Sequence, residues 1–248
     1  MGICMQIQLT IRSEQPCRLP ISYHHIQQSA IYHLLRNCPL TDDLHDHGAT
    51  YGKRTYKLFT FGPLLGKYKI VEKSIIFQDE IRWEIRSDDR QVIMMLYKKV
   101  RQDGLVLGEN ELKDVEAIIR DNRIEEDSIY IKMISPICVY ATNPDTKKTY
   151  FYSPQEKEFS KAVQDNFQRK YTAAYMVEPE HEIFIEPVKV STKDKYLTKY
   201  KGFYISGWNG IYKLSGQRKY LDFLYQTGIG AKNSQGFGMF EVVPKEQT

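Results

Sequence analysis

Residues 228–238 read GIGAKNSQGFG, four glycines in eleven residues between an apolar helical pattern and the apolar run Met239–Val243. Glycine adopts positive φ and lets another backbone approach closely, so this density predicts a tight connection with something lying against it. A helix cap followed by a glycine-weakened strand would explain an isolated pair of such steps. Here Lys232, Asn233 and Ser234 join the two steps and add a cation and two small polar groups. The combination favours a ligand-facing loop at which a phosphate backbone could bind.

The glycine loop fits neither common nucleotide motif. No Lys-Ser or Lys-Thr pair follows the glycines, as a P-loop requires, and the spacing is wrong for a dinucleotide-binding turn that opens a helix. We therefore expect a polymeric ligand rather than a free nucleotide.

Charge is distributed unevenly along the chain. The net charge is only +4, but residues 109–127 hold eight acidic against three basic residues, whereas eight basic residues face only Asp194 within 189–220. Aromatic residues alternate with those cations, as in a surface that neutralises phosphates and stacks bases of single-stranded nucleic acid. A solvated lysine face on an aromatic-cored sheet is the alternative, and the pattern alone does not separate the two.

Length and composition limit the class of protein. A chain of 248 residues has room for one large domain or two ordinary ones. Targeting segments and long apolar runs are missing, so the sequence predicts a soluble, cytoplasmic protein with no membrane partner. The four cysteines, Cys4, Cys17, Cys38 and Cys138, are scattered without a Cys-x-x-Cys pair, which predicts reduced core residues rather than metal ligands.

The N-terminal half has the order strand, helix, strand, strand, helix, strand. Ile7, Leu9 and Ile11 alternate with polar residues in a first strand, and Gly104 closes the second helix. The expected elements are a strand at 5–11, a helix at 20–37, strands at 56–61 and 73–86, a helix at 88–102, and strand-like segments within 105–119. This is the order of a ferredoxin-like domain.

The same order recurs after the acidic segment 120–127. Ser153, Pro154 and Glu156 have the pattern of a helix N-terminus. The expected elements are a strand at 129–142, a helix at 153–175, strands at 183–190 and 200–213, a helix at 217–226, the glycine loop, and a strand at 237–243. We therefore predict an α+β fold of two tandem ferredoxin-like (RRM/RAMP) domains, 1–126 and 127–248, with a C-terminal glycine-rich loop.

Three polar groups of the N-terminal half are candidates for chemistry. Tyr32 falls on the side of its helix opposite the apolar arc. His45 and His47 lie in a polar connection without a further Cys/His cluster, so an acid/base role is favoured over metal binding. Lys57 lies in the strand at 56–61, where it could equally protect a sheet edge.

Four motifs together resemble a known family. They are the glycine loop, the run 19–32 that contains LPISY and SAIY, Leu44-His45, and KLFTF at 57–61. They are similar to those of the RAMP-superfamily endoribonuclease that processes CRISPR precursor RNA, and the similarity spans nearly the whole chain. The glycine loop alone would indicate only the superfamily, many of whose members bind RNA without cutting it.

The resemblance implies a cofactor-independent, metal-independent endoribonuclease. It would cut CRISPR repeat RNA and leave a 2′,3′-cyclic phosphate and a 5′-hydroxyl. By motif match the catalytic residues are Tyr32, His45 and Lys57, with the base and the acid not assigned between Tyr32 and His45. His47 is the alternative histidine, and Gly62 stands where the family often has serine.

The expected partner is CRISPR repeat RNA within precursor crRNA, with a CRISPR effector complex and a second copy of the chain as further candidates. The alternatives are a RAMP protein that binds crRNA without cutting it and a ferredoxin-like regulator of a small ligand. The candidate RNA-binding residues are Lys199, Lys201, Gly228, Gly230, Lys232, Asn233, Ser234, Gly236 and Gly238.

Overall fold

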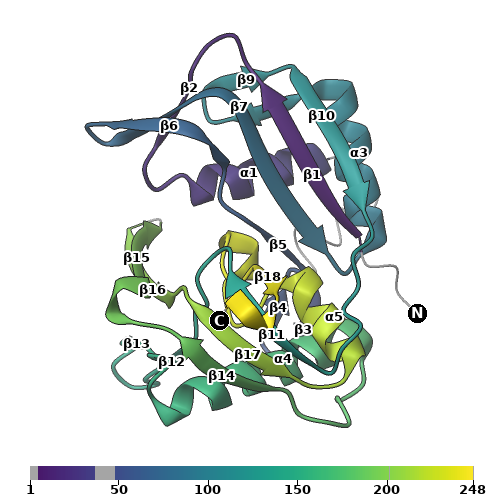
Figure 1. The fold of residues 1–248 in the computed structure, drawn as a ribbon, viewed down its shortest axis with the longest axis vertical. Coiled ribbons are helices and arrows are strands. Elements are labelled where there is room, and N and C mark those ends of the chain that lie inside the picture. Colours follow the sequence, from purple (N-terminus) through teal and green to yellow (C-terminus); the bar gives the residue numbers. More distant parts are fainter. Residues whose placement is uncertain (1–4, 37–47, 201, 248) are drawn as a thin grey trace.

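The computed structural model describes residues 5–36, 48–200 and 202–247. Two α/β halves lie one above the other in Figure 1, each with helices packed on one face of an antiparallel sheet. Each half follows the ferredoxin-like order, which confirms the predicted α+β fold with a tandem arrangement.

The sheet of the N-terminal half has the order β10-β1-β7-β2, and β5 and β6 also pair with β7. Ile7, Leu9 and Ile11 of β1 are fully buried, as their alternation predicts. The elements are β1 (Met5–Arg12), β2 (Cys17–Pro20), α1 (His24–Leu35), β3 (Ala49–Tyr51), β4 (Arg54–Tyr56), β5 (Phe59–Phe61), β6 (Leu65–Val71), β7 (Ser74–Ser87), α3 (Arg90–Asp103), β8 (Leu105–Leu107), β9 (Asn110–Leu112) and β10 (Asp114–Arg120).

The sheet of the C-terminal half has the order β14-β17-β11-β18. Phe159, Val163 and Phe167 of α4 pack on it with Leu221 and Leu224 of α5. The elements are β11 (Ser128–Met133), β12 (Tyr140–Thr142), β13 (Thr149–Phe151), α4 (Lys157–Tyr175), β14 (Phe184–Lys189), η1 (Thr192–Asp194), β15 (Lys195–Tyr200), β16 (Phe203–Trp208), β17 (Ile211–Ser215), α5 (Arg218–Thr227), η2 (Asn233–Gln235), β18 (Phe240–Val243) and η3 (Lys245–Gln247).

Two of the predicted strands are wrong in extent because the backbone hydrogen bonds go elsewhere. The expected strand 129–142 stops at Met133, since Pro136 has no N–H to give to a ladder and Ile134 and Ser135 donate to the carbonyl of Met239. The expected strand 200–213 is two strands, β16 and β17, separated by a turn at Gly210, where φ is 111°.

Other boundaries also differ: the helix expected at 20–37 is His24–Leu35, and the strand expected at 237–243 is Phe240–Val243. The expected helix at 153–175 begins at Lys157, because Glu156 accepts the backbone N–H of Ser153 within a turn before the helix. The expected strand at 56–61 is interrupted between β4 and β5, and all three β5 side chains are buried.

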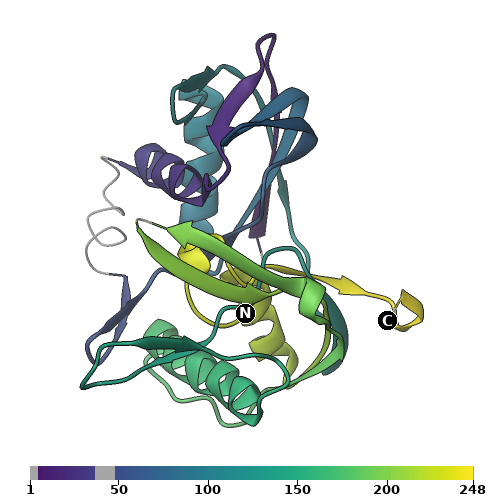
Figure 2. The same ribbon diagram turned by 90° about the vertical axis from the view of Figure 1, so that its left-hand side faces the viewer.

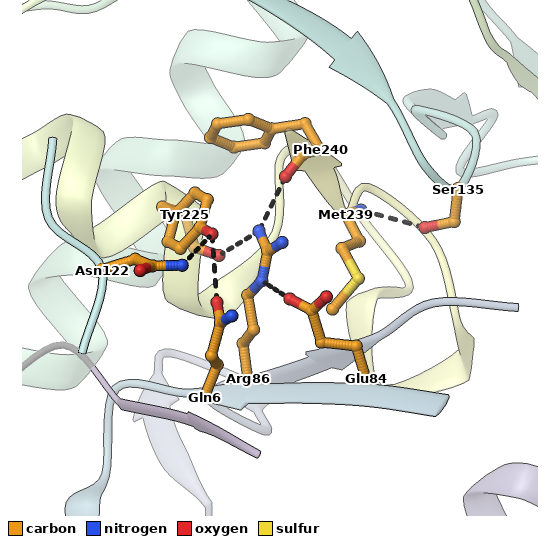
Figure 3. A network of polar contacts seen from close by, with 8 residues as sticks. All are labelled: Gln6, Glu84, Arg86, Asn122, Ser135, Tyr225, Met239 and Phe240. Carbon is orange, nitrogen blue, oxygen red and sulfur yellow. Dashed lines mark hydrogen bonds and ion pairs between the residues drawn. The ribbon is translucent and has the colours of Figure 1, made fainter. Parts of the chain in front are cut away.

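A buried arginine joins the two halves. The Arg86 side chain of β7 is only 2% exposed, and its guanidinium donates to the carbonyl oxygens of Phe240 (2.7 Å) and Tyr225 (3.4 Å). It also pairs with Glu84 at 2.6 Å and lies 3.8 Å from the ring centre of Tyr225 (Figure 3). Because a buried charge is costly when unpaired, these contacts fix the two halves in one arrangement.

The connection between the halves packs with the second one. Ile124 belongs to the C-terminal core, and its N–H donates to Asp222 of α5 at 2.6 Å. The boundary at residues 126 and 127 stays a prediction. Within the described ranges, the helices are too short or too polar to cross a membrane.

Candidate functional site

The glycine loop has the backbone that its sequence predicts. Gly228 caps α5 with φ of 83°, and Gly230, Gly236 and Gly238 also have positive φ. The helix cap considered from the sequence is thus present at Gly228, where it forms one end of a longer turn around η2.

The close approach predicted for the loop is made by the protein itself. A Cβ atom at Gly236 would lie 2.7 Å from the buried ring of Phe61, and one at Gly230 would lie 2.7 Å from the carbonyl oxygen of Cys138. Thr60 adds a hydrogen bond from its hydroxyl to the carbonyl of Phe237 at 3.2 Å. The loop is therefore held between β5 of the first half and the segment after β11 of the second.

Asn233 and Lys170 hold the loop from inside. The Asn233 amide donates to the carbonyl oxygens of Ile229 (3.2 Å) and Phe237 (3.1 Å), and it accepts from the Lys170 ammonium at 3.0 Å. Lys170 also donates to the carbonyl of Gly228. The side chain of Asn233 is thus committed to protein partners, and it shapes the loop.

Lys170 was not singled out from the sequence. Its side chain is buried, and burial lowers its pKa to about 7, an effect that the nearby carboxylate of Asp88 opposes. The sequence signal that could have indicated its burial is its position seven residues after Val163, which places it on the apolar stripe of α4. Its partners lie at 228 and 233, so no local pattern reveals its role.

Tyr32 contacts the loop from α1. Its hydroxyl makes hydrogen-bond contacts with the side chains of Ser234 and Gln28, and Gln28 donates to the Ser234 carbonyl at 2.7 Å. The Tyr32 ring meets Phe59 edge-on at 6.0 Å. Burial raises the pKa of Tyr32, with Tyr200 acting in the same direction and the hydrogen bonds in the other. Tyr32 is accordingly a neutral phenol near pH 7, able to donate a hydrogen bond.

Lys57 lies in a polar cleft that the loop also lines. The cleft has a volume of about 690 Å³, and its walls are β4, α4, β12 and the loop residues from Gly230 to Gln235. Lys57 and Ser234 both line it. Since Tyr32 contacts Ser234, the loop places two of the three predicted catalytic residues around itself.

Part of the basic and aromatic segment 189–220 forms the hairpin β15–β16, which Figure 2 shows crossing in front of the C-terminal half. Phe203 and Tyr204 are 78% and 66% exposed, and the Lys199 ammonium lies 5.9 Å from the Tyr204 ring centre. Phe203 and Tyr204 are therefore surface rings, whereas Tyr212 and Tyr220 of the same segment belong to the buried C-terminal core. Tyr200 donates from its hydroxyl to Gln28, which brings the hairpin to α1.

Three predicted site residues lie outside the described residues. They are His45, its alternative His47, and Lys201. The segment that contains both histidines follows Arg36, shortly after Tyr32, and precedes Gly48, β4 and Lys57 in the chain. Of the described histidines, His24 is poorly suited to proton transfer near neutral pH, because burial and the neighbouring His25 lower its pKa to about 4.

Substitution of Gly236 by alanine should destabilise the fold through both backbone strain and a clash. Its φ of 85° costs an L-residue about 1 kcal/mol, and the buried Phe61 ring adds overpacking, for a total of about 3 kcal/mol. Gly52 is the matched control, with φ of 59° and no described atom within 4 Å of an added Cβ, so Gly52→Ala should cost about 1 kcal/mol. Urea unfolding measures both, and equal losses would show that the packing on Phe61 is unimportant.

Comparisons with known proteins agree along the whole chain. The family model for the C-terminal part of CRISPR associated protein Cas6 matches residues 116–242, just over half of the chain. CRISPR-associated endoribonuclease Cas6 1 of Methanocaldococcus jannaschii is 25% identical over 247 residues, which are 95% of this chain and 91% of the relative. The Pyrococcus furiosus Cas6 endoribonuclease is 31% identical over 131 residues, 53% of this chain and 48% of the relative.

Solved structures give the same result. One described as CRISPR associated protein Cas6 superposes with a TM-score of 0.77 at 26% identity and covers 97% of this chain and 100% of its own. A Cas6-related protein from Pyrococcus furiosus has a TM-score of 0.80 at 20% identity, over 98% of this chain and 99% of that one, and it supports the fold alone.

Proposed function

The chain belongs to the Cas6 family of CRISPR-associated proteins, and on that premise we propose that it is an endoribonuclease that cuts CRISPR repeat RNA within precursor crRNA. Family membership confirms the resemblance drawn from the sequence motifs. The relatives named above are CRISPR-associated endoribonucleases, and the M. jannaschii protein aligns over nearly the full length of both chains.

One observation of this chain carries the proposal. The glycine loop contacts Tyr32 through Ser234 and also lines the cleft of Lys57. A proton-transfer group and a cation thus meet at this loop, an arrangement that can cut a phosphodiester. The site would be shared between the halves, with the catalytic side chains from residues 1–126 and the RNA-holding loop from residues 127–248.

The proposed reaction uses the RNA's own 2′-hydroxyl and no metal ion. A base removes the 2′-proton, the 2′-oxygen attacks the adjacent phosphorus, and the bond from phosphorus to the 5′-oxygen breaks. An acid protonates the leaving 5′-oxygen. The products are a 2′,3′-cyclic phosphate and a 5′-hydroxyl, and Lys57 would stabilise the negative charge of the phosphorane.

The raised pKa of Tyr32 supports a division of roles. A neutral phenol is a poor base near pH 7 but donates a hydrogen bond or a proton readily. We therefore assign Tyr32 as the proton donor to the leaving 5′-oxygen and His45 as the base that removes the 2′-proton.

The hairpin β15–β16 should bind RNA mainly by charge and stacking. The double variant Lys199→Ala, Lys201→Ala should weaken repeat binding and reduce the slope of log affinity against log salt by about 1 to 2, since about 0.7 counterion is released per phosphate on single strands. Filter binding over a range of salt concentrations measures this slope. Lys157→Ala, a change of charge at the start of α4, is the control and should leave the slope unchanged. An unchanged slope in the double variant would place the RNA elsewhere.

A further inference from the structure

The cleft that contains Lys57 has features that catalysis at the loop does not use. Its lining includes Asn166 and Arg169 of α4, Tyr56 of β4 and Gln235 of η2. Its volume, about 690 Å³, lies within the range of small-molecule sites.

Four buried polar atoms at this cleft have no hydrogen-bond partner among the described residues. They are Asn166 Oδ1, Arg169 Nε, the Tyr56 hydroxyl and Gln235 Oε1, and all four residues line the cleft. Asn166 is only 7% exposed. Because a buried unpaired polar group destabilises a folded protein, such a group calls for an explanation, and a ligand that completes the bonds is one.

Cations and an aromatic ring accompany these atoms. Arg54, Arg169 and Lys232 line the cleft, and the Lys232 ammonium lies 5.3 Å from the ring centre of Tyr140. Burial raises the pKa of Tyr140, and Arg54 and Arg169 are close enough to oppose that shift. The cleft's carboxylate, Asp165, is paired with Lys161 at 2.9 Å. The chemistry suits an anionic ligand with a planar ring.

We propose that this cleft binds one nucleotide of the repeat RNA beside the cleavage site, with its base on Tyr140, Asn166 and Gln235 and its phosphate on Arg54, Arg169 and Lys232. The inference rests on the proposed function and extends it to sequence specificity. Lys57 and Ser234 lie in the same walls, so a nucleotide bound here is continuous with the scissile phosphate. Two unpaired acceptor oxygens select a base that has an exocyclic amino group, which uracil lacks.

The test pairs variants of the protein with RNAs that lack single bases. Repeat RNA with a 2′-deoxy nucleotide at the cleavage site is compared, by fluorescence anisotropy, with versions that are abasic at one neighbouring position each. Wild-type protein should lose affinity about 5- to 100-fold at one position, the effect of one lost stacked base. With Asn166→Leu or Gln235→Leu, that loss should shrink to about twofold, since part of the contact is already gone. Gln168→Leu, on the same helix but outside the cleft lining, should behave as wild type.

Thermal unfolding separates a binding role from a structural one. Asn166→Leu should melt at or above the wild-type temperature, since it removes an unpaired polar atom, while its RNA affinity falls. Tyr140→Phe should retain the abasic penalty that Tyr140→Ala loses.

Two results would overturn the inference while leaving the proposed function intact: abasic penalties that are identical in wild type and variants at every position, or an Asn166→Leu protein that melts several degrees lower. Wild-type protein that neither binds nor cuts repeat RNA would overturn both proposals.

Discussion

A repeat RNA whose attacking 2′-hydroxyl is replaced by hydrogen should not be cut, while it should bind with nearly unchanged affinity. The proposed reaction has no other nucleophile, because the 2′-oxygen itself becomes part of the cyclic phosphate. One hydroxyl contributes little to an interface that depends on phosphate contacts and stacked bases. The measurement is single-turnover cleavage at saturating protein, with binding by anisotropy on the same RNA.

A deoxy substitution one nucleotide away from the cleavage site is the control and should be cut at about the normal rate. Cleavage of the deoxy RNA at its usual position would show that water or a protein side chain attacks the phosphorus. The cyclic-phosphate mechanism would then be wrong, although family membership would stand.

His45→Ala should slow single-turnover cleavage by at least about a hundredfold with little change in RNA affinity. Losing one general acid or base commonly costs 10² to 10⁴ in rate, about 3 to 5 kcal/mol of barrier. His45 follows Leu44 directly, as in the family's Leu-His motif. In the proposed division of roles Tyr32 is the proton donor and His45 the base, and burial lowers the pKa of His24 to about 4, which makes it poorly suited to take that place.

His47→Ala is the matched control, since it removes the same side chain two residues away. It should change the cleavage rate only a few fold. A large rate loss in His47→Ala and a small one in His45→Ala would assign proton transfer to His47. A full rate in both variants would mean that the reaction uses neither histidine.

The pattern of local residues predicts the fold well. Alternation in β1, the glycine after α3 and the recurring element order together predict two ferredoxin-like halves, as observed. Short-range signals succeed here because each element's residues decide its own shape. The positive φ values of the glycine loop are predicted for the same reason.

Longer-range interactions explain what the sequence does not predict. The backbone around Pro136 leaves the β11 ladder because it forms hydrogen bonds with Gly238 and Met239, at the end of the glycine loop. Arg86 and Lys170 are both buried against carbonyl oxygens of distant segments, partners that no local pattern predicts. The unpaired amide oxygen of Asn166 becomes visible only when α4, β4 and η2 are placed together.

One residue of the glycine loop has a different role from the one its sequence suggests. Asn233 was expected to face the RNA, but its amide binds the loop and Lys170, so it positions its neighbours. Ser234 and Lys232 both line the cleft, and Ser234 also contacts Tyr32. The loop organises the site because it contacts Tyr32 and lines the same cleft as Lys57.

Incubation of the wild-type protein with its host's own repeat RNA in excess EDTA tests the central claim most directly. We predict a single cut in the repeat, at a rate unchanged by EDTA, with a 5′-hydroxyl on one product and a 2′,3′-cyclic phosphate on the other, identified by mass spectrometry. Tight binding without any cut, or a cut that requires added magnesium, would contradict it.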